Sequence, residues 1–394
     1  MLQSFADLEP EARVLLLCAR PRLDPAARAE VERLLDAVDW TVLVRMAEAH
    51  GVTALALRRL ADIPGVPPEI AAAGETYLAN QAARNAALTR ALKDVIVALA
   101  AKGIPAIPFK GPVVAQLAYG DPALRRYRDL DILVREKDAA AACEALTALG
   151  FRATGSLSPA QLRAFRRYSG QDIVFKGDVA VEPHWALAPR TLSLRIDYEG
   201  LWTRAREIDL EGQPIFCFGP EDLVTVLCLH GSKEQWTLLL WIADLAHMIA
   251  ASPALDWPAL LRRARTQGVL RMVLIGLILA GEAIELPAGV KEAIAADPIA
   301  HELAEQAAAR LFALDRAEES IYRLSSFRHR MRERAGDRWR YVIRTVTTPR
   351  DMHYSIVKLP DALFFLYTPI KLVHDYLLLP FWMSGKRLTA RRDG

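Results

Sequence analysis

The segment Asp-Leu-Asp-Ile-Leu-Val at residues 129–134 constrains the fold more than any other part of the sequence. It is short and apolar after its second aspartate, which predicts a β-strand. Alternate side chains of a strand face the same way, so Asp129 and Asp131 share one face while Leu130 and Ile132 pack on a core behind it. The two carboxylates would lie about 6–7 Å apart. Without partners they would repel each other and lose their hydration.

Two kinds of partner would compensate these carboxylates. One is a pair of divalent cations about 3.5–4 Å apart, bridged by the carboxylates and by substrate phosphates. The other is ion pairing with the arginines just before the strand, Arg125, Arg126 and Arg128. Both interpretations hold for an isolated Asp-x-Asp motif, and the neighbouring motifs favour the cations.

The turn Phe-Lys-Gly-Pro at residues 109–112 lies about twenty residues before the first aspartate. A strand that runs into a glycine turn and then a helix leaves backbone N–H groups facing an anion. Lys110 adds a positive charge beside Gly111. A lone Lys-Gly turn is a weak signal, but its combination with Asp-x-Asp predicts a phosphate site next to a metal site.

A third carboxylate follows in the segment Val-Ala-Val-Glu-Pro-His-Trp-Ala, residues 179–186. The pattern predicts a strand of the same small sheet, with Glu182 as the third acid and His184 on the same face. Pro183 indicates that this strand lies at an edge or ends there. The alternative is a half-buried hairpin with a glutamate at the surface.

The hydrophobic patterning divides the chain into four parts and gives an α+β fold class, with a small mixed sheet inside mainly helical flanks. Residues 1–78 carry apolar positions spaced by three and four, which predicts helices. Residues 79–218 predict an α/β unit that opens with a long helix ending at Gly103. Residues 219–325 are again helical, and residues 326–394 are a basic, aromatic extension.

Two local breaks are predicted within this plan. A Lys-Gly-Asp turn at residues 176–178 should join strands at 171–175 and 179–186 in a hairpin. The segment 219–250 predicts two helices that are broken near Gly231.

The composition excludes some classes of protein. The 394 residues include 50 basic and 47 acidic ones, and this balance argues against a nucleic-acid coat protein. The four cysteines form no Cys-x-x-Cys pair, which predicts reduced, buried thiols rather than a zinc site. The N-terminus does not resemble a signal peptide and no apolar run predicts a membrane span, so we expect a cytoplasmic protein.

A glycine turn, an Asp-x-Asp strand and a later strand acid, in this order, resemble the polymerase-β-like nucleotidyltransferase superfamily. More narrowly, residues 108–134, 181–185 and 227–249 are similar to the bacterial family called the uncharacterised nucleotidyltransferases. The resemblance covers roughly residues 25–320. It implies a polymerase-β-like core within the α+β fold and a helical domain, residues 219–325, that closes the nucleotide cleft.

The resemblance also implies a role for each matching residue. Asp129 and Asp131 match the paired metal-binding acids. Glu182 matches the third acid, which binds the catalytic metal or accepts the proton of the acceptor. Gly111 matches the turn glycine beside the nucleotide phosphates.

The phosphates of a nucleotide require positive charge at the site. Pro112 stands where the superfamily has a serine, so a hydroxyl contact to phosphate is missing and Lys110 is expected to supply the charge instead. Arg125 and Arg128 are further candidates for holding the triphosphate. Arg126 is expected to be solvated.

Three polar residues of the helical part are candidates for the other side of the cleft. His230 and Lys233 would share a helix face if the helix continues past Gly231. Asp244 lies in an apolar helix, where a carboxylate needs a partner. The alternative is a structural network in which Asp244 pairs with His247 or Lys233.

The expected activity is transfer of a nucleoside monophosphate, AMP from ATP in the first instance, to an acceptor hydroxyl with two Mg²⁺ ions and release of pyrophosphate. The acceptor could be a small molecule, peptide, polysaccharide, protein or tRNA. One alternative is a toxin-like transferase that modifies tRNA or protein, for which Arg163, Arg166 and Arg167 would line a basic groove. Another is a non-catalytic nucleotide-binding or assembly protein on the same scaffold.

The C-terminal extension has two further interpretations. Residues 371–392 combine an apolar, aromatic stripe with a basic tail, which is typical of a helix at a membrane surface or of a packed helix with a solvated tail. Residues 328–344 are basic and aromatic and could contact nucleic acid. A solvated helix face is the favoured interpretation of that stretch.

Overall fold

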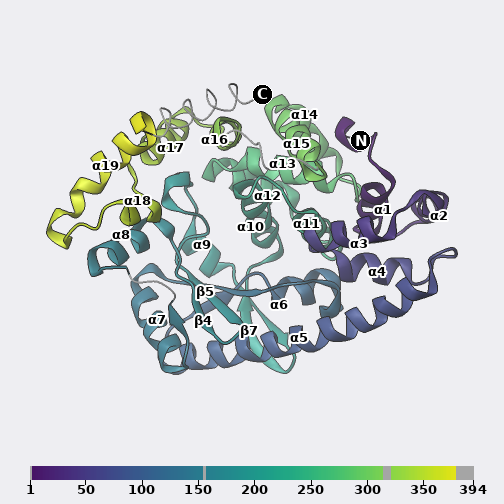
Figure 1. Cartoon of the computed structure of the whole chain (residues 1–394), viewed down its shortest axis with the longest axis horizontal. Coiled ribbons are helices and arrows are strands. Elements are labelled where there is room, and N and C mark those ends of the chain that lie inside the picture. Colours follow the sequence, from purple (N-terminus) through teal and green to yellow (C-terminus); the bar gives the residue numbers. More distant parts are fainter. Residues whose placement is uncertain (1, 154–156, 314–320, 379–394) are drawn as a thin grey trace, which may run out of the picture.

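The computed structural model describes residues 2–153, 157–313 and 321–378. Helices enclose a small mixed sheet, so the α+β class predicted from the sequence is confirmed (Figure 1). The sheet has the order β1–β2–β5–β4–β3. Its strands are β1 Ala106–Pro108, β2 Asp129–Val134, β3 Arg152–Ala153, β4 Val174–Lys176 and β5 Val179–His184.

The two strands that carry the acids are neighbours in the centre of this sheet. β2 and β5 pair in parallel, and the register sets Asp131 opposite Glu182. β4 and β5 form the predicted antiparallel hairpin. Because β5 is central, the expectation that Pro183 marks an edge strand is wrong, whereas the expectation that the strand ends there is confirmed, since β5 stops at His184.

The N-terminal part is helical, as predicted, and leads into one long helix that runs along one face of the sheet (Figure 1). That helix, α5, begins at Pro68 rather than near residue 80, because proline is favoured at the first position of a helix. Its apolar side packs on Leu130 and Ile132 of β2. The helices before the sheet are α1 Pro10–Cys18, α2 Pro25–Leu34, α3 Trp40–Ala49, α4 Thr53–Leu60 and α5 Pro68–Ala101.

A second helical layer covers the other face of the sheet. Leu133, which shares its face of β2 with Asp129 and Asp131, belongs to the same core as the apolar side chains of α10, α11 and α13. The remaining elements are α6 Pro112–Val114, α7 Ala139–Ala148, α8 Pro159–Ser169, α9 Tyr198–Thr203, β6 Arg206–Leu210, β7 Gln213–Cys217, α10 Pro220–Lys233, α11 Leu239–Ala250, α12 Trp257–Gln267, α13 Leu270–Ala280, α14 Ala288–Ala295, α15 Pro298–Leu311, α16 Ile321–Arg330, α17 Ala335–Thr347, α18 Asp351–Ile356 and α19 Tyr367–Val373. The acid-bearing face therefore lies between the sheet and the helices.

The four cysteines are free and buried, as the sequence predicts. Burial raises the pKa of Cys18 and Cys143 to about 12, so these thiols stay protonated at neutral pH. Within the described ranges we find no helix with the length and hydropathy that crossing a membrane requires.

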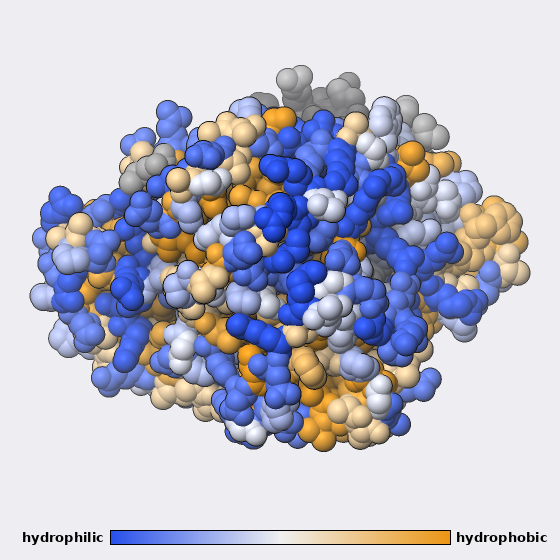
Figure 2. All heavy atoms as spheres, turned by 180° about the vertical axis from the view of Figure 1, so that it is seen from behind, coloured by the Kyte–Doolittle hydropathy of each residue, from blue (hydrophilic) through white to orange (hydrophobic). Residues whose placement is uncertain are grey.

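The C-terminal extension packs on the rest of the molecule. Arg332 is fully buried and donates from Nε (2.9 Å) and Nη2 (2.6 Å) to the carbonyl oxygen of Leu192, so this arginine of the basic 328–344 stretch is not solvated. Exposed apolar side chains also gather here, among them Trp339 and Phe365. Figure 2 shows hydrophobic atoms at the right-hand edge, where the end of the molecule bearing α18 and α19 lies. Membrane contact through residues 371–392 stays a prediction, and residues 379–394 lie outside the described residues.

The break between α10 and α11 lies later than predicted. α10 continues past Gly231 to Lys233, and the chain turns at Gln235 and Trp236, whose φ angles are 57° and 55°. The turn folds the fully buried ring of Trp236 back onto Gly231. Glycine is needed at position 231 for this contact, because a Cβ there would lie 2.6 Å from the indole ring.

We expect Gly231→Ala to lower the free energy of unfolding by about 1–3 kcal/mol, because the added methyl group overpacks a rigid aromatic contact. Gly289→Ala is the matched control, since a Cβ at this exposed helical position meets nothing within 4 Å. That variant should be neutral or stabilising by up to about 1 kcal/mol. Denaturant unfolding of both variants measures the difference, and equal stabilities would contradict the packing described.

Candidate active site

A buried carboxylate, Asp131, is the centre of the candidate site. Its Oδ1 accepts hydrogen bonds from Lys110 Nζ at 3.0 Å and from His184 Nε2 at 2.9 Å. Burial would raise the pKa of Asp131, but the Lys110 ammonium and the His184 hydrogen bond together hold it well below its usual range. Its Oδ2 is buried and has no hydrogen-bond partner among the described residues. The carboxylate is therefore ionised and has one oxygen free.

Glu182 lies beside Asp131 on the neighbouring strand, as its register requires. Its Oε2 accepts a hydrogen bond from Gln171 Nε2 at 2.8 Å and lies 3.5 Å from His184 Nε2. One oxygen or nitrogen from each of Asp131, Glu182 and His184 falls within 4.8 Å of the other two. The hairpin that ends in β5 thus brings a second carboxylate to the first.

Asp129 is the third carboxylate and is half-buried at the start of β2. Burial raises its pKa, and the negative charges of Asp131 and Glu182 raise it further, with Lys110 acting against them. Burial is the largest cause of this rise, and the two neighbouring carboxylates add to it by disfavouring a further negative charge beside them.

The donor set fits a divalent cation of the Mg²⁺ type. Such ions take oxygen ligands, and carboxylates on neighbouring strands supply them. Two observations support the fit, namely the orphaned Oδ2 of Asp131 and the raised pKa of Asp129. A cation bound to Asp129, Asp131 and Glu182 would compensate both.

The turn at Gly111 is pressed against the acid strand. Gly111 has a φ of +51°, and a Cβ there would lie 3.2 Å from the carbonyl oxygen of Asp129. Any larger residue would be strained and would push the turn away from β2. The turn offers fewer free N–H groups than predicted, because Pro112 has none and the N–H of Val113 donates to the carbonyl oxygen of Lys110 at 3.1 Å. Lys110 is therefore the main positive group of the turn.

A second buried ion pair holds the loop before β2 to the helical layer. The Arg125 Nε and Nη2 donate to the two carboxylate oxygens of Asp244 at 2.8 and 2.7 Å, and the Tyr119 hydroxyl donates to Asp244 Oδ1 at 2.9 Å. The Arg125 Nη1 also donates to the carbonyl oxygen of Gly111 at 3.4 Å. The suggestion that Asp244 pairs with His247 or Lys233 is thus wrong. Arg125 therefore forms an ion pair with Asp244, and its contact with Gly111 connects that ion pair to the turn.

The structure overturns the interpretation in which the arginines neutralise the strand acids. Arg125 pairs with Asp244, Arg126 has Glu48 as its neighbour at 3.9 Å, and the side chain of Arg128 is exposed. Asp131 instead pairs with Lys110 and His184. The sequence places His184 on the acid face without indicating its role, and its spacing of two residues from Glu182 is the signal that it contacts the acids.

The three candidates on the helices, His230, Lys233 and Asp244, have different surroundings. His230 is half-buried on α10, and burial together with the charges of Lys110 and Lys233 holds its pKa well below the usual value. The imidazole of His230 is therefore neutral, and it lies within electrostatic range of Lys110. Lys233 forms an ion pair with the adjacent Glu234 at 3.2 Å. Asp244 belongs to the buried ion pair beside the turn, and Arg125 connects it to the carbonyl oxygen of Gly111.

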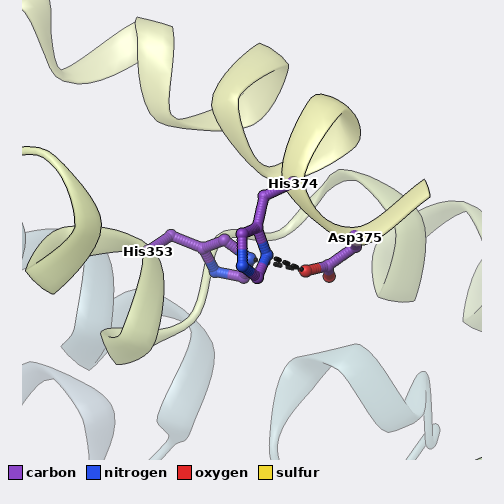
Figure 3. A group of neighbouring side chains, drawn as sticks. All are labelled: His353, His374 and Asp375. Atoms are coloured by element: carbon purple, nitrogen blue, oxygen red, sulfur yellow. Dashed lines mark hydrogen bonds and ion pairs between the residues drawn. The ribbon is translucent and has the colours of Figure 1, made fainter. Parts of the chain in front are cut away.

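A second cluster of metal-binding residue types has a structural explanation. Asp375 accepts hydrogen bonds from His353 Nε2 at 3.0 Å and His374 Nδ1 at 2.8 Å (Figure 3). It also accepts from Lys371 Nζ at 2.5 Å and Arg350 Nη2 at 3.0 Å. Burial would raise the pKa of Asp375, but these hydrogen bonds hold it well below its usual range, and the cluster joins α18 to the end of α19.

We expect Asp244→Leu to lower the free energy of unfolding by about 3–5 kcal/mol, because it leaves the charge of Arg125 buried without a partner. The double variant Arg125→Met/Asp244→Leu should be less destabilised than Asp244→Leu alone, since it removes both charges. Denaturant unfolding of Arg125→Met, Asp244→Leu and the double variant measures the coupling between the two side chains. Strictly additive losses would contradict a direct ion pair.

Comparison with known proteins gives one family. The model of the family described as uncharacterised nucleotidyltransferase matches residues 36–284, which is more than half of the 394-residue chain. Neither the curated proteins nor the solved structures contain a significant match. The matched range includes the Gly111 turn, the three acids and the Arg125–Asp244 ion pair. The chain therefore belongs to the uncharacterised nucleotidyltransferase family.

Proposed function

We propose that the protein transfers a nucleoside monophosphate, AMP from ATP in the first instance, to an acceptor hydroxyl on a polymerase-β-like core. The family assignment supports nucleotidyl transfer in general. The observation that carries the specific proposal is the parallel register of β2 and β5, which sets Glu182 opposite a buried Asp131 with a free oxygen.

Each residue of the site would have a separate role in such a transfer. Asp129, Asp131 and Glu182 would hold Mg²⁺, which would polarise the phosphates and stabilise the departing pyrophosphate. Lys110 remains protonated because the carboxylates raise its pKa against the effect of burial, so it can neutralise phosphate charge. Arg128 is exposed and free to reach the outer phosphates.

The reaction makes one bond and breaks one. The acceptor oxygen attacks the α-phosphorus, the bond from this phosphorus to the bridging oxygen breaks, and pyrophosphate leaves with the electron pair. The hydroxyl proton passes to Glu182 or, where Glu182 completes the metal site, to solvent. Gln171 holds Glu182 in place for either role through its hydrogen bond at 2.8 Å.

The alternatives are weaker on specific grounds. A non-catalytic scaffold has no need for three clustered carboxylates, and all three are present here. A toxin-like transferase acting on tRNA or protein would use a basic groove along α8. Arg166 of that helix is engaged with Asp172 at 2.7 Å, which leaves only Arg163 and Arg167 exposed there.

We expect ATP to bind only with Mg²⁺, and Asp131→Asn to weaken Mg²⁺-dependent ATP binding by on the order of 10- to 100-fold or more. Asp178→Asn is the matched control, because it makes the same chemical change in the exposed β4–β5 turn. Titration calorimetry of wild type and both variants measures the effect. ATP binding that is indifferent to Mg²⁺ and to Asp131→Asn would contradict the proposal.

A further inference from the structure

A cavity of about 450 Å³ lies at the carboxyl ends of the two acid strands. This volume is within the range of small-molecule sites. Its walls come from the end of β2, the segment after β5, α9 and α17, and among its lining residues are Val134, Trp185, Tyr198, Trp202 and Arg344.

The position of this cavity follows from the strand register. Val134 is three residues beyond Asp131 on β2, which corresponds to about 10 Å along a strand. Trp185 directly follows His184, the residue bonded to Asp131. Tyr198 and Trp202 pack against the core on the acid-bearing face of the sheet. Val134 itself belongs to the core on the opposite face, so the cavity lies beyond the ends of the two strands, and α9 forms its wall on the acid-bearing side.

The phosphate-binding turn lies at the opposite end of β2. Gly111 is pressed against Asp129, the first residue of the strand. The turn, the acids and the cavity thus follow one another along the strand. In-line displacement places the attacking oxygen and the leaving group on opposite sides of the phosphorus. With the leaving pyrophosphate at the turn, the cavity is on the side from which the acceptor attacks.

The charges that line the cavity nearly cancel. Arg135 pairs with Glu199, and Arg190 pairs with Glu136. Arg344 is the fifth charged group of the lining. Its Nη1 donates to the carbonyl oxygen of Arg190 at 2.6 Å, and no carboxylate among the described residues pairs with it. One positive charge is therefore left for a ligand, and the two ion pairs offer both donors and acceptors.

The aromatic residues of the cavity offer ring surfaces rather than polar groups. The indole N–H of Trp185 donates to the carbonyl oxygen of Arg166 at 3.2 Å, and the hydroxyl of Tyr198 accepts from the backbone N–H of Leu187 at 3.0 Å. The Trp202 ring is covered on one side by the guanidinium of Arg135 at 4.9 Å. Ring faces beside paired charges suit a ligand with C–H faces and several hydroxyl groups.

We propose that this cavity is the acceptor site and that the acceptor is a sugar acid, a hydroxylated ring with one carboxylate. The inference rests on the proposed nucleotidyl transfer. The carboxylate pairs with Arg344, the ring packs on the aromatic wall, and one hydroxyl points toward the carboxylates of Asp131 and Glu182. That hydroxyl oxygen forms the new bond to the α-phosphorus, and pyrophosphate leaves toward Lys110.

The test uses D-glucuronate, D-galacturonate, D-mannuronate and neutral D-glucose as probes, titrated calorimetrically into the full chain with Mg²⁺ and a non-hydrolysable ATP analogue. At least one sugar acid should bind ten times more tightly than glucose. Arg344→Ala should abolish this preference and Arg344→Lys should retain part of it. Trp202→Leu should weaken all sugars. Arg90→Ala, on exposed surface of α5, removes the same charge elsewhere and should change nothing.

The outcomes separate this inference from the proposed function. No binding of any sugar acid to wild type, or equal binding by Arg344→Ala with an unchanged unfolding midpoint, overturns the sugar-acid site. Tighter binding of glucose 1-phosphate than of every sugar acid also overturns it, in favour of a phosphorylated acceptor. Asp131→Asn should still bind the sugar acid. If wild type binds sugar acids but no nucleotide, the cavity assignment survives and the transferase proposal fails.

Discussion

The burial of Asp131 is the constraint on which the rest of the site depends. A carboxylate that is 2% exposed in the middle of a sheet is costly unless it is paired. Lys110 and His184 compensate it through one oxygen, which fixes the Lys-Gly-Pro turn on one side and the end of β5 on the other. The second oxygen is left without a partner. The same pairing that lets the fold tolerate Asp131 leaves one of its oxygens unpaired, opposite Glu182 on the neighbouring strand.

The Arg125–Asp244 ion pair gives this arrangement its rigidity. It joins the loop before β2 to α11 in the opposite layer, and Arg125 also contacts the carbonyl oxygen of Gly111. Arg125 is engaged in this ion pair, and its expected contact with the triphosphate stays a prediction. The sheet supplies the carboxylates, and the helical layer holds the turn against them.

Much of the fold could be predicted from the sequence because it depends on local patterns. Alternation in residues 129–134 predicts which side chains of β2 pack on α5, and the Lys-Gly-Asp turn predicts the β4–β5 hairpin. The partners of the buried charges could not be predicted in this way. Asp244 lies 119 residues from Arg125, and His184 lies 53 residues from Asp131. The three-dimensional packing determines that Arg125 pairs with Asp244 on α11 and that Asp131 pairs with Lys110 and His184.

The position of the α10 break and the start of α5 show a related limit. Gly231 lies inside a helix because Trp236 folds back over it, and Pro68 begins a helix that was expected to start near residue 80. Both residues are of types that usually interrupt helices. Here Gly231 makes room for Trp236, and Pro68 occupies the first position of a helix. Local signals for helix ends are therefore less certain guides than the strand pattern that carries the acids.

The most direct test of the central claim is anomalous diffraction from a crystal soaked in Mn²⁺ with a non-hydrolysable ATP analogue. Our account predicts a peak within coordination distance of Asp131 Oδ2 and Glu182, with the phosphates on the Lys110 side. Nucleotide density elsewhere, or Mn²⁺ bound only at His353, His374 and Asp375, would contradict the assignment of these carboxylates to the catalytic cation.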